Sequence, residues 1–411
     1  MKDLVQRAER LRADFPLLHQ RHPSGSPLIY LDNAATTHKP RAVLQTLERF
    51  YTTTNANIHR GLHWLSQEAT RLYEEAREVV AQFLQAASPQ EIVFVKGTTE
   101  GINLIAHGLR QVHFQPGDEL LLTAAEHHAN IVPWHLIARD IPVRLRPAPL
   151  RSDGGLDWEA FQQQITPRTR LIAITAMSNA LGTEMPVSAI GALARQRDIP
   201  FLVDAAQFAP HKPINVQEWC ADFVVFSGHK LYGPTGIGVV YMRHPWGETL
   251  PPYQGGGDMI VEVRWDSSTY AKPPQKFEAG TPPIAEAIAL AESIRYLTQK
   301  VGWDFIQAYE QYLTDYAQAR IEEVPGLQLF GTARPKGAIW SFYSEAVHPH
   351  DMATFLDQAG IAARAGHHCA QPLMEALQVP ATTRASLAFY NLPSEIDSLA
   401  QSLHQIVHFF V

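Results

Sequence analysis

A lysine follows an apolar run in the segment Ser227-Gly228-His229-Lys230. The run covers residues 223–226, and a glycine-rich stretch follows at residues 233–238. A lysine amine at the end of a buried strand can condense with an aldehyde cofactor to form a Schiff base. Taken alone, the segment also fits a solvated lysine after a strand.

Asp204 ends a second apolar run, at residues 200–203, and precedes Lys230 by 26 residues. That separation leaves room for one helical crossover between neighbouring parallel strands. A carboxylate at the C-terminal edge of a parallel sheet lies where α/β proteins bind ligands. There it could keep a cofactor ring nitrogen protonated. The alternative is an N-cap of a following helix.

The segment Gly97-Thr98-Thr99-Glu100-Gly101 follows an apolar run at residues 92–95 and precedes a helical pattern. Free N–H groups and hydroxyls at a helix N-terminus suit a phosphate, although ordinary capping would use the same residue types. The sequence contains neither a G-x-x-x-x-G-K-[ST] loop nor a G-x-G-x-x-G fingerprint, so a nucleotide site is not predicted.

Two adjacent histidines stand in Glu126-His127-His128-Ala129-Asn130, after an apolar run at residues 119–122. A histidine at a sheet edge can stack on a planar ring. The alternatives are a metal pair or a plain loop. Adjacent histidine side chains diverge and chelate poorly, so no metal site is predicted.

Cys369 lies in Arg364-Ala365-Gly366-His367-His368-Cys369, and Arg384 follows fifteen residues later. Basic neighbours favour the thiolate, which is the reactive form of cysteine. A structural role for Cys369 is the alternative. The other cysteine, Cys220, precedes an apolar run and is predicted to pack. Two cysteines in 411 residues argue against a disulfide framework and suit a reducing cytoplasm.

The composition narrows the class of protein further. The chain is 45% hydrophobic, with a net charge of −7 and no block of Lys and Arg, so a nucleic-acid surface is not expected. No apolar run approaches the ~18 residues that span a bilayer. Residues 1–16 predict a short amphipathic helix, and they lack the apolar core of a signal peptide.

The elements that must position these residues alternate along the chain. Apolar runs separated by helical patterns predict a mostly parallel, doubly wound sheet. One helix is predicted over residues 66–84, and another over 394–410, where Ser394 and Asp397 resemble a capping box. We predict an N-terminal segment (1–25), a large domain (26–295) and a smaller α+β domain (296–411). The runs lie at residues 92–95, 119–122, 171–175, 201–203, 223–226 and 238–241.

In their order along nearly the whole chain, these segments resemble the class V aminotransferases, which are fold-type I pyridoxal-phosphate enzymes. More narrowly they resemble the group II cysteine desulfurases of the SufS/CsdA type, and they imply a large domain with a seven-stranded-type sheet. Further matching segments are Tyr30-Leu31-Asp32-Asn33-Ala34-Ala35-Thr36-Thr37, Asn57-Ile58-His59-Arg60-Gly61, Ser178-Asn179-Ala180-Leu181-Gly182-Thr183, Asp204-Ala205-Ala206-Gln207, Glu278-Ala279-Gly280-Thr281-Pro282 and Arg384-Ala385-Ser386.

The resemblance implies a role for each matching residue. Lys230 would hold pyridoxal 5'-phosphate and move protons, and Cys369 would accept the sulfur. The cofactor ring would be held by Asp204 at its nitrogen, by Gln207 at its oxygen and by His127 on its face. The phosphate would be bound by Thr98, Thr99, Ser227 and His229. Thr281 would reach the phosphate from the second subunit of a homodimer. Asn179 and Arg384 would bind the substrate carboxylate, while His59 and Arg364 would line the pocket near the sulfur.

The implied reaction takes sulfur from L-cysteine, releases alanine and leaves a persulfide on Cys369. A small acceptor protein of the SufE/CsdE type would then take the sulfur for iron–sulfur clusters or other sulfur metabolism. Alternatives on the same fold are a selenocysteine lyase, a cysteine sulfinate desulfinase and a kynureninase-like hydrolase. A non-catalytic protein that only docks partners is an alternative from another class.

Overall fold

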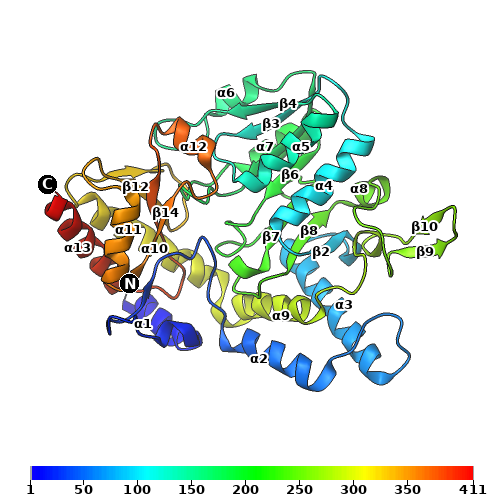
Figure 1. Cartoon of the computed structure of the whole chain (residues 1–411), viewed down its shortest axis with the longest axis horizontal. Helices are drawn as coiled ribbons and strands as arrows, with labels where there is room; N and C mark the ends of the chain where they lie inside the picture. Colours follow the sequence, from blue (N-terminus) through cyan, green and yellow to red (C-terminus); the bar gives the residue numbers. More distant parts are fainter. Residues whose placement is uncertain (1, 411) are drawn as a thin grey trace.

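The computed structural model describes residues 2–410, and a seven-stranded sheet forms its larger half (Figure 1). Strand β8 runs antiparallel to both of its neighbours, and the other neighbouring strands are parallel. In spatial order the strands are β2 (Ile92–Val95), β8 (Gly238–Met242), β7 (Phe223–Ser227), β6 (Phe201–Asp204), β5 (Thr169–Thr175), β3 (Glu119–Thr123) and β4 (Arg144–Ala148).

Six of these strands lie on the predicted apolar runs, because both faces of the sheet are covered. Alternate side chains of β7 enter different clusters. Val224 and Phe226 pack with helices α3, α7 and α9, whereas Phe223 and Val225 pack with α4 and α5. The helices of this half are α2 (Arg41–Arg49), α3 (Trp64–Leu84), α4 (Thr98–Val112), α5 (Val132–Asp140), α6 (Trp158–Gln163), α7 (Val187–Gln196), α8 (His244–Thr249) and α9 (Ile284–Arg295).

Strand β4 was not predicted from the sequence. It is the edge strand Arg-Leu-Arg-Pro-Ala, in which Arg144 and Pro147 are exposed. Only Ala148 of this strand is buried, and an edge strand tolerates proline, so β4 lacks the continuous apolar pattern of β2, the buried strand at the other edge.

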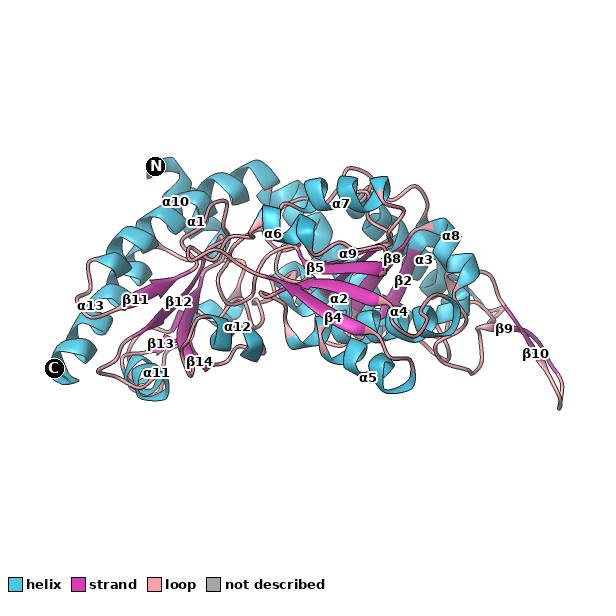
Figure 2. Ribbon diagram, turned by 90° about the horizontal axis from the view of Figure 1, so that it is seen from above, coloured by secondary structure: helices cyan, strands magenta, loops and turns pink. Residues whose placement is uncertain are grey.

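A four-stranded antiparallel sheet forms the second half, beside the first (Figure 2). Strand β1 (Ile29–Tyr30) pairs in parallel with β13 (Ile361–Ala362), which brings the segment after Tyr30 to this sheet. The strands, in spatial order, are β11 (Gln328–Phe330), β12 (Ile339–Tyr343), β15 (Thr382–Ser386) and β14 (Arg364–Gly366), and the helices are α10 (Trp303–Glu322), α11 (Pro349–Gln358), α12 (Gln371–Ala376) and α13 (Pro393–Phe410).

The N-terminal helix α1 (Lys2–Arg12) contacts this second half. Arg7 donates to the carbonyl of Val301 at 2.6 Å, and Arg12 pairs with Glu395 at 2.9 Å. One hydrophobic cluster runs from the seven-stranded sheet into the four-stranded one. The boundaries near residues 25 and 295 therefore remain a prediction.

Helix α13 begins differently from its prediction. Glu395, not Asp397, reaches back to the helix start and accepts the N–H of Leu392 at 2.9 Å. Asp397 accepts hydrogen bonds from Tyr316 and Arg320 on α10 instead. The predicted Ser394–Asp397 box was wrong because tertiary contacts engage Asp397.

A hairpin of β9 (Ile260–Val263) and β10 (Ser268–Tyr270) projects from the large half, away from the four-stranded sheet (Figure 2). Its Val261 and Trp265 side chains are exposed. Among residues 2–410 no helix is both long and apolar enough to cross a membrane.

Candidate active site

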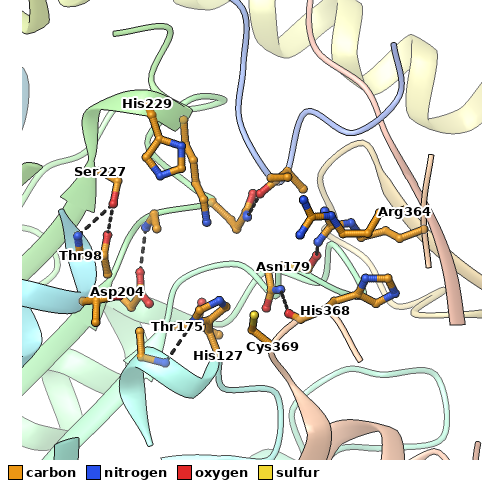
Figure 3. Close-up of a pocket in the computed structure, with 18 residues that line it drawn as sticks. Thr98, His127, Thr175, Asn179, Asp204, Ser227, His229, Arg364, His368 and Cys369 are labelled. Atoms are coloured by element: carbon orange, nitrogen blue, oxygen red, sulfur yellow. Dashed lines mark hydrogen bonds between the residues drawn. The ribbon is translucent and has the colours of Figure 1, made fainter. Parts of the chain in front are cut away.

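A cavity of about 230 Å³ opens at the C-terminal edge of the parallel strands, and the second half of the molecule contributes part of its wall (Figure 3). Twelve of the residues predicted for the site line it. They are Thr98, Thr99, His127, Asn179, Asp204, Gln207, Ser227, His229, Lys230, Arg364, Cys369 and Arg384. Sequence reasoning assigned no role to the other lining residues, which are Ala34, Ala35, Ala129, Thr175, Ala206 and His368.

Lys230 ends a short 3-10 helix, Gly228–Lys230, directly after β7. Burial lowers the pKa of its amine to about 8. The nearby Asp204 carboxylate raises this pKa, but by less than burial lowers it. A substantial fraction of this amine is therefore neutral near pH 8, which is the nucleophilic form. The alternative of a solvated surface lysine does not hold.

Asp204 is the last residue of β6 and is 4% exposed. One of its carboxylate oxygens accepts the N–H of Ala206 at 2.9 Å. Burial raises the pKa of this carboxyl group, while Ala206 and Lys230 lower it. The residues that follow form turns and no helix, so Asp204 is not a helix N-cap.

Helix α4 begins at Thr98, and its first turn faces the cavity. The Thr98 N–H donates to the Ser227 hydroxyl at 2.9 Å, and the two hydroxyl oxygens lie 2.8 Å apart. His229 lines the same wall, and burial followed by Lys230 lowers the pKa of its imidazole to about 4. Helix N–H groups, hydroxyls and a neutral imidazole suit an anion such as phosphate.

His127 presents a neutral ring to the cavity. Burial, and then Lys230, lower the pKa of its imidazole to about 3. Its Nδ1 accepts the N–H of Ala129 at 3.0 Å, which assigns the remaining ring proton to Nε2. Beside it, Glu126 is enclosed and bonded to Thr123 and Asn130, and burial raises the pKa of its carboxyl group to about 7. This network holds the loop that carries His127.

The loop of Cys369 connects β14 to α12, and Cys369 itself is exposed. His368 and Cys369 have φ values of 53° and 55°, in the left-handed region that residues with a side chain rarely adopt. Such a conformation needs support from its surroundings. The Asn179 amide donates to the His368 carbonyl at 2.6 Å, and the His128 main chain donates to the Cys369 carbonyl at 2.7 Å.

Arg384 is 2% exposed, and it crosses the space between the two halves. Its guanidinium donates to the Asn179 carbonyl at 2.8 Å and to Asp32 Oδ1 at 2.7 Å, while Nε has no partner among residues 2–410. Arg364 Nε donates to the other Asp32 oxygen at 3.1 Å. Asp32 thus joins two arginines of the site.

Sequence reasoning gave Asp32 no role, although the residue belongs to the quoted segment from Tyr30 to Thr37. The available signal was that Asp32 is the only charged residue in this segment. Its two arginine partners lie more than 300 positions away, so no local pattern identifies the contact.

Two predicted site residues lie outside the cavity of the single chain. His59 is exposed, and its imidazole lies 3.0 Å from Glu74 on α3. Thr281 is also exposed and precedes α9. Neither residue lines the pocket that contains Cys369 and Lys230.

The residues around the cavity fit pyridoxal phosphate. They include a partly neutral lysine amine, a buried carboxylate, a neutral imidazole and a hydroxyl-lined helix N-terminus. Within the described residues 2–410, Arg384 Nε and Asn179 Oδ1 are buried polar atoms without a hydrogen-bond partner, and they suit a further polar ligand.

Known proteins resemble this chain over nearly its full length. A probable cysteine desulfurase from Streptomyces coelicolor is 47% identical over 98% of this chain and 97% of its own length. A cysteine desulfurase from Klebsiella pneumoniae (strain 342) is 47% identical, over 97% of this chain and 98% of its own. The chain spans only 65% of a longer relative, the probable cysteine desulfurase 1 of Mycobacterium leprae, with 48% identity.

Solved structures agree with these relatives. The apo cysteine desulfurase from Thermococcus onnurineus superimposes with a TM-score of 0.90 at 38% identity, covering 96% of this chain and 98% of that one. The Escherichia coli cysteine desulfurase CsdA gives a TM-score of 0.89 at 38% identity, over 98% and 99% of the two chains. The predicted fold class and pyridoxal-phosphate cofactor are confirmed. Residues 29–399 match the family Aminotransferase class-V, and the chain belongs to this family, within its group of cysteine desulfurases.

Proposed function

We propose that the protein is a pyridoxal-phosphate-dependent cysteine desulfurase, which converts L-cysteine to L-alanine and leaves the sulfur on Cys369 as a persulfide. The observation that carries the proposal is that Cys369 and Lys230, from different halves of the molecule, line one cavity. The full-length relatives named as cysteine desulfurases support the same activity.

Several residues hold and tune the cofactor in this proposal. Bound pyridoxal phosphate supplies an aldehyde that condenses with the substrate amine and a ring that withdraws electrons from Cα. Asp204 would keep the ring nitrogen protonated, Gln207 would bond the ring oxygen and His127 would contact the ring face. The phosphate would be bound by Thr98, Thr99, Ser227 and His229, which lie around the start of α4.

Arg384 and Asn179 would bind the substrate carboxylate. Asp32 and the Asn179 carbonyl occupy only some of the five N–H groups of Arg384, and the free Nε remains available. A planar guanidinium held in this way can grip a carboxylate through two parallel bonds, which a lysine cannot do. The carboxylate would then fix the position of the rest of the substrate.

Lys230 and Cys369 would perform the transfers of protons and sulfur. Lys230 Nζ, partly neutral near pH 8, can take the proton from Cα and return one to the product. The Cβ–S bond breaks as an S–S bond forms between the substrate sulfur and Cys369 Sγ. Cβ keeps the electron pair and gains a proton, so alanine forms and no external oxidant is required.

We also propose a homodimer. The segments that carry His59 and the β9–β10 hairpin are joined by an Arg60–Asp258 ion pair of 2.7 Å. Around them Leu62 and Trp265 are exposed, at 92% and 108%. Exposed apolar side chains of this kind mark interaction surfaces. A second copy would cover them and bring Thr281 to the phosphate and His59 to the pocket mouth.

A sulfur acceptor of the SufE/CsdE type, acting in the cytoplasm, is the proposed partner of the persulfide. Cys369 is exposed at the mouth of the cavity, so a thiol of another protein can reach it. Transfer to that thiol would regenerate Cys369 for the next substrate. The sulfur would then serve iron–sulfur clusters or other sulfur metabolism.

The test is to quantify alanine and protein-bound persulfide with L-cysteine as substrate. Cys369→Ser should form no persulfide but should keep the cofactor absorbance. The control is Cys220→Ser, which replaces the other cysteine of the chain and should behave as the unchanged protein. Full alanine and sulfide production by Cys369→Ser would refute the sulfur-transfer mechanism. Such a result would favour a selenocysteine lyase or cysteine sulfinate desulfinase as the main activity.

A further inference from the structure

Two arginines of the site stand directly opposite each other on neighbouring strands. Arg364 of β14 and Arg384 of β15 are register partners in the four-stranded sheet. Like charges in this position repel one another. The Asp32 carboxylate lies between them and accepts from Arg384 at 2.7 Å and from Arg364 at 3.1 Å.

The two arginines differ in what they present to a substrate. Arg384 is 2% exposed in its side chain, whereas Arg364 is 46% exposed and lies at the open side of the cavity with Cys369. In the proposed function Arg384 binds the substrate carboxylate. The group on the substrate Cβ must therefore point toward Cys369, on the side of Arg364.

We propose that Asp32 is a specificity-determining residue, which by pairing with Arg364 lowers reactivity toward the anionic group of L-cysteine sulfinate relative to the uncharged thiol of L-cysteine. This inference rests on the proposed function. The two substrates share the amine and the carboxylate, and they differ by one negative charge on Cβ. A free Arg364 would attract that charge, whereas an Arg364 paired with Asp32 offers little net attraction.

The experiment compares kcat/KM for the two substrates through the alanine that both release, with cofactor-loaded protein. Asp32→Asn keeps the shape of the side chain and removes its charge. We expect the ratio of sulfinate to cysteine to rise about tenfold, the factor that ~1.4 kcal/mol represents. Arg364→Gln should lower this ratio, and the double variant should return it close to the starting value.

A matched control is Asp140→Asn, which removes the aspartate of the surface pair with Arg110 on the helices α4 and α5. It should leave the ratio unchanged. Asp32→Ser, which also removes the charge, replaces Asp32→Asn if that variant loses the cofactor absorbance. The proposal is overturned if neither Asp32 variant shifts the ratio, or if the double variant keeps the full increase, because Asp32 would then act without Arg364.

The outcome separates this inference from the proposed function. If the unchanged protein makes no alanine from L-cysteine, the proposed function fails. If the unchanged protein does make alanine from L-cysteine, but the ratio of sulfinate to cysteine does not respond to the Asp32 variants, only the proposed role of Asp32 fails.

Discussion

The main-chain N–H of His128 donates to the carbonyl oxygen of Cys369 at 2.7 Å. The imidazole of the same histidine makes a second bond, because its Nε2 accepts the N–H of Gln371 at 3.0 Å. His128 thus holds the cysteine loop on both sides of Ala370. It also ties this loop to the neighbouring His127, which faces the cofactor cavity.

Replacement of His128 by alanine should slow sulfur transfer and leave cofactor binding intact. The Gln371 N–H would lose its acceptor, a loss worth ~1 kcal/mol or more, and the left-handed turn at Cys369 would lose support. We expect kcat for alanine formation to fall about tenfold with an unchanged cofactor absorbance. His135→Ala, at an exposed position of α5, is the control. Equal rates in both variants would show that the imidazole does not position the loop.

Gly238→Ala should weaken cofactor binding through the backbone. A Cβ at Gly238 would lie 2.5 Å from the Cα of Gly97 and 2.7 Å from the carbonyl oxygen of Phe226. Gly97 must then shift, and with it the start of α4, where Thr98 meets Ser227. We expect the Kd for pyridoxal phosphate to rise at least about tenfold, from overpacking of ~1–3 kcal/mol. Gly255→Ala meets no atom within 4 Å and should leave the Kd unchanged.

The buried pair of Arg77 and Glu278 should be essential for stability. Arg77 donates to both Glu278 oxygens, at 2.7 and 2.9 Å, and Glu278 also accepts from the Phe94 N–H at 2.7 Å. Their side chains are 2% and 5% exposed. Glu278→Gln would leave the buried arginine charge with only the partly exposed Glu74, 3.0 Å from its Nε, as a counter-charge, so we expect a loss of ~3 kcal/mol in the free energy of unfolding.

Urea unfolding measures this loss. The matched control is Glu68→Gln, which breaks the exposed pair with Arg71 on α3 and should cost less than ~1 kcal/mol. Similar costs for the two variants would contradict the prediction, because they would show that burial adds nothing to the Arg77 pair.

His38 should make the protein sensitive to acid. Burial, and then Lys39 and Arg12, lower the pKa of its imidazole from 6.5 to about 4, and its Nε2 has no partner among residues 2–410. Between these two pH values the unfolded chain binds a proton that the folded chain does not. Stability contributed by neutral His38 is therefore complete above pH 6.5 and falls as the pH drops toward 4.

The measurement is the free energy of unfolding at pH 7 and pH 5. His38→Gln should reduce the loss between these values by about 1–2 kcal/mol, whereas His404→Gln, on the exposed face of α13, should not change it. An identical pH dependence for His38→Gln and the unchanged protein would refute the prediction.

Much of the fold follows from local sequence. Six strands of the large sheet carry continuous apolar runs because helices cover both faces, and α3 and α13 show their amphipathic stripes. Strand β4 has no such run because its side chains are mostly not buried, with Arg144 and Pro147 exposed, and the direction of β8 is not encoded locally at all. An apolar run determines that a strand is buried, but not which way its neighbours run.

The residue types at the site could also be predicted from the chain. Lys230, Asp204 and the start of α4 lie at strand ends, where a parallel sheet collects its functional residues, and all of them line one cavity. The order of the segments around them predicted the family. Cys369, among its basic neighbours, predicted the reaction. Their individual roles stay predictions until the variants are measured.

Tertiary structure alone decided the contacts between distant segments. The chain by itself determined which groups are present: a lysine amine, carboxylates, histidines, arginines and the thiol of Cys369. Asp32 between Arg364 and Arg384, and His128 beneath Cys369, depend on segments more than 200 residues apart that meet only when the two halves pack. Local propensity specifies strands and helices through neighbouring residues, whereas such contacts arise from packing of the whole molecule, which no short stretch of sequence records.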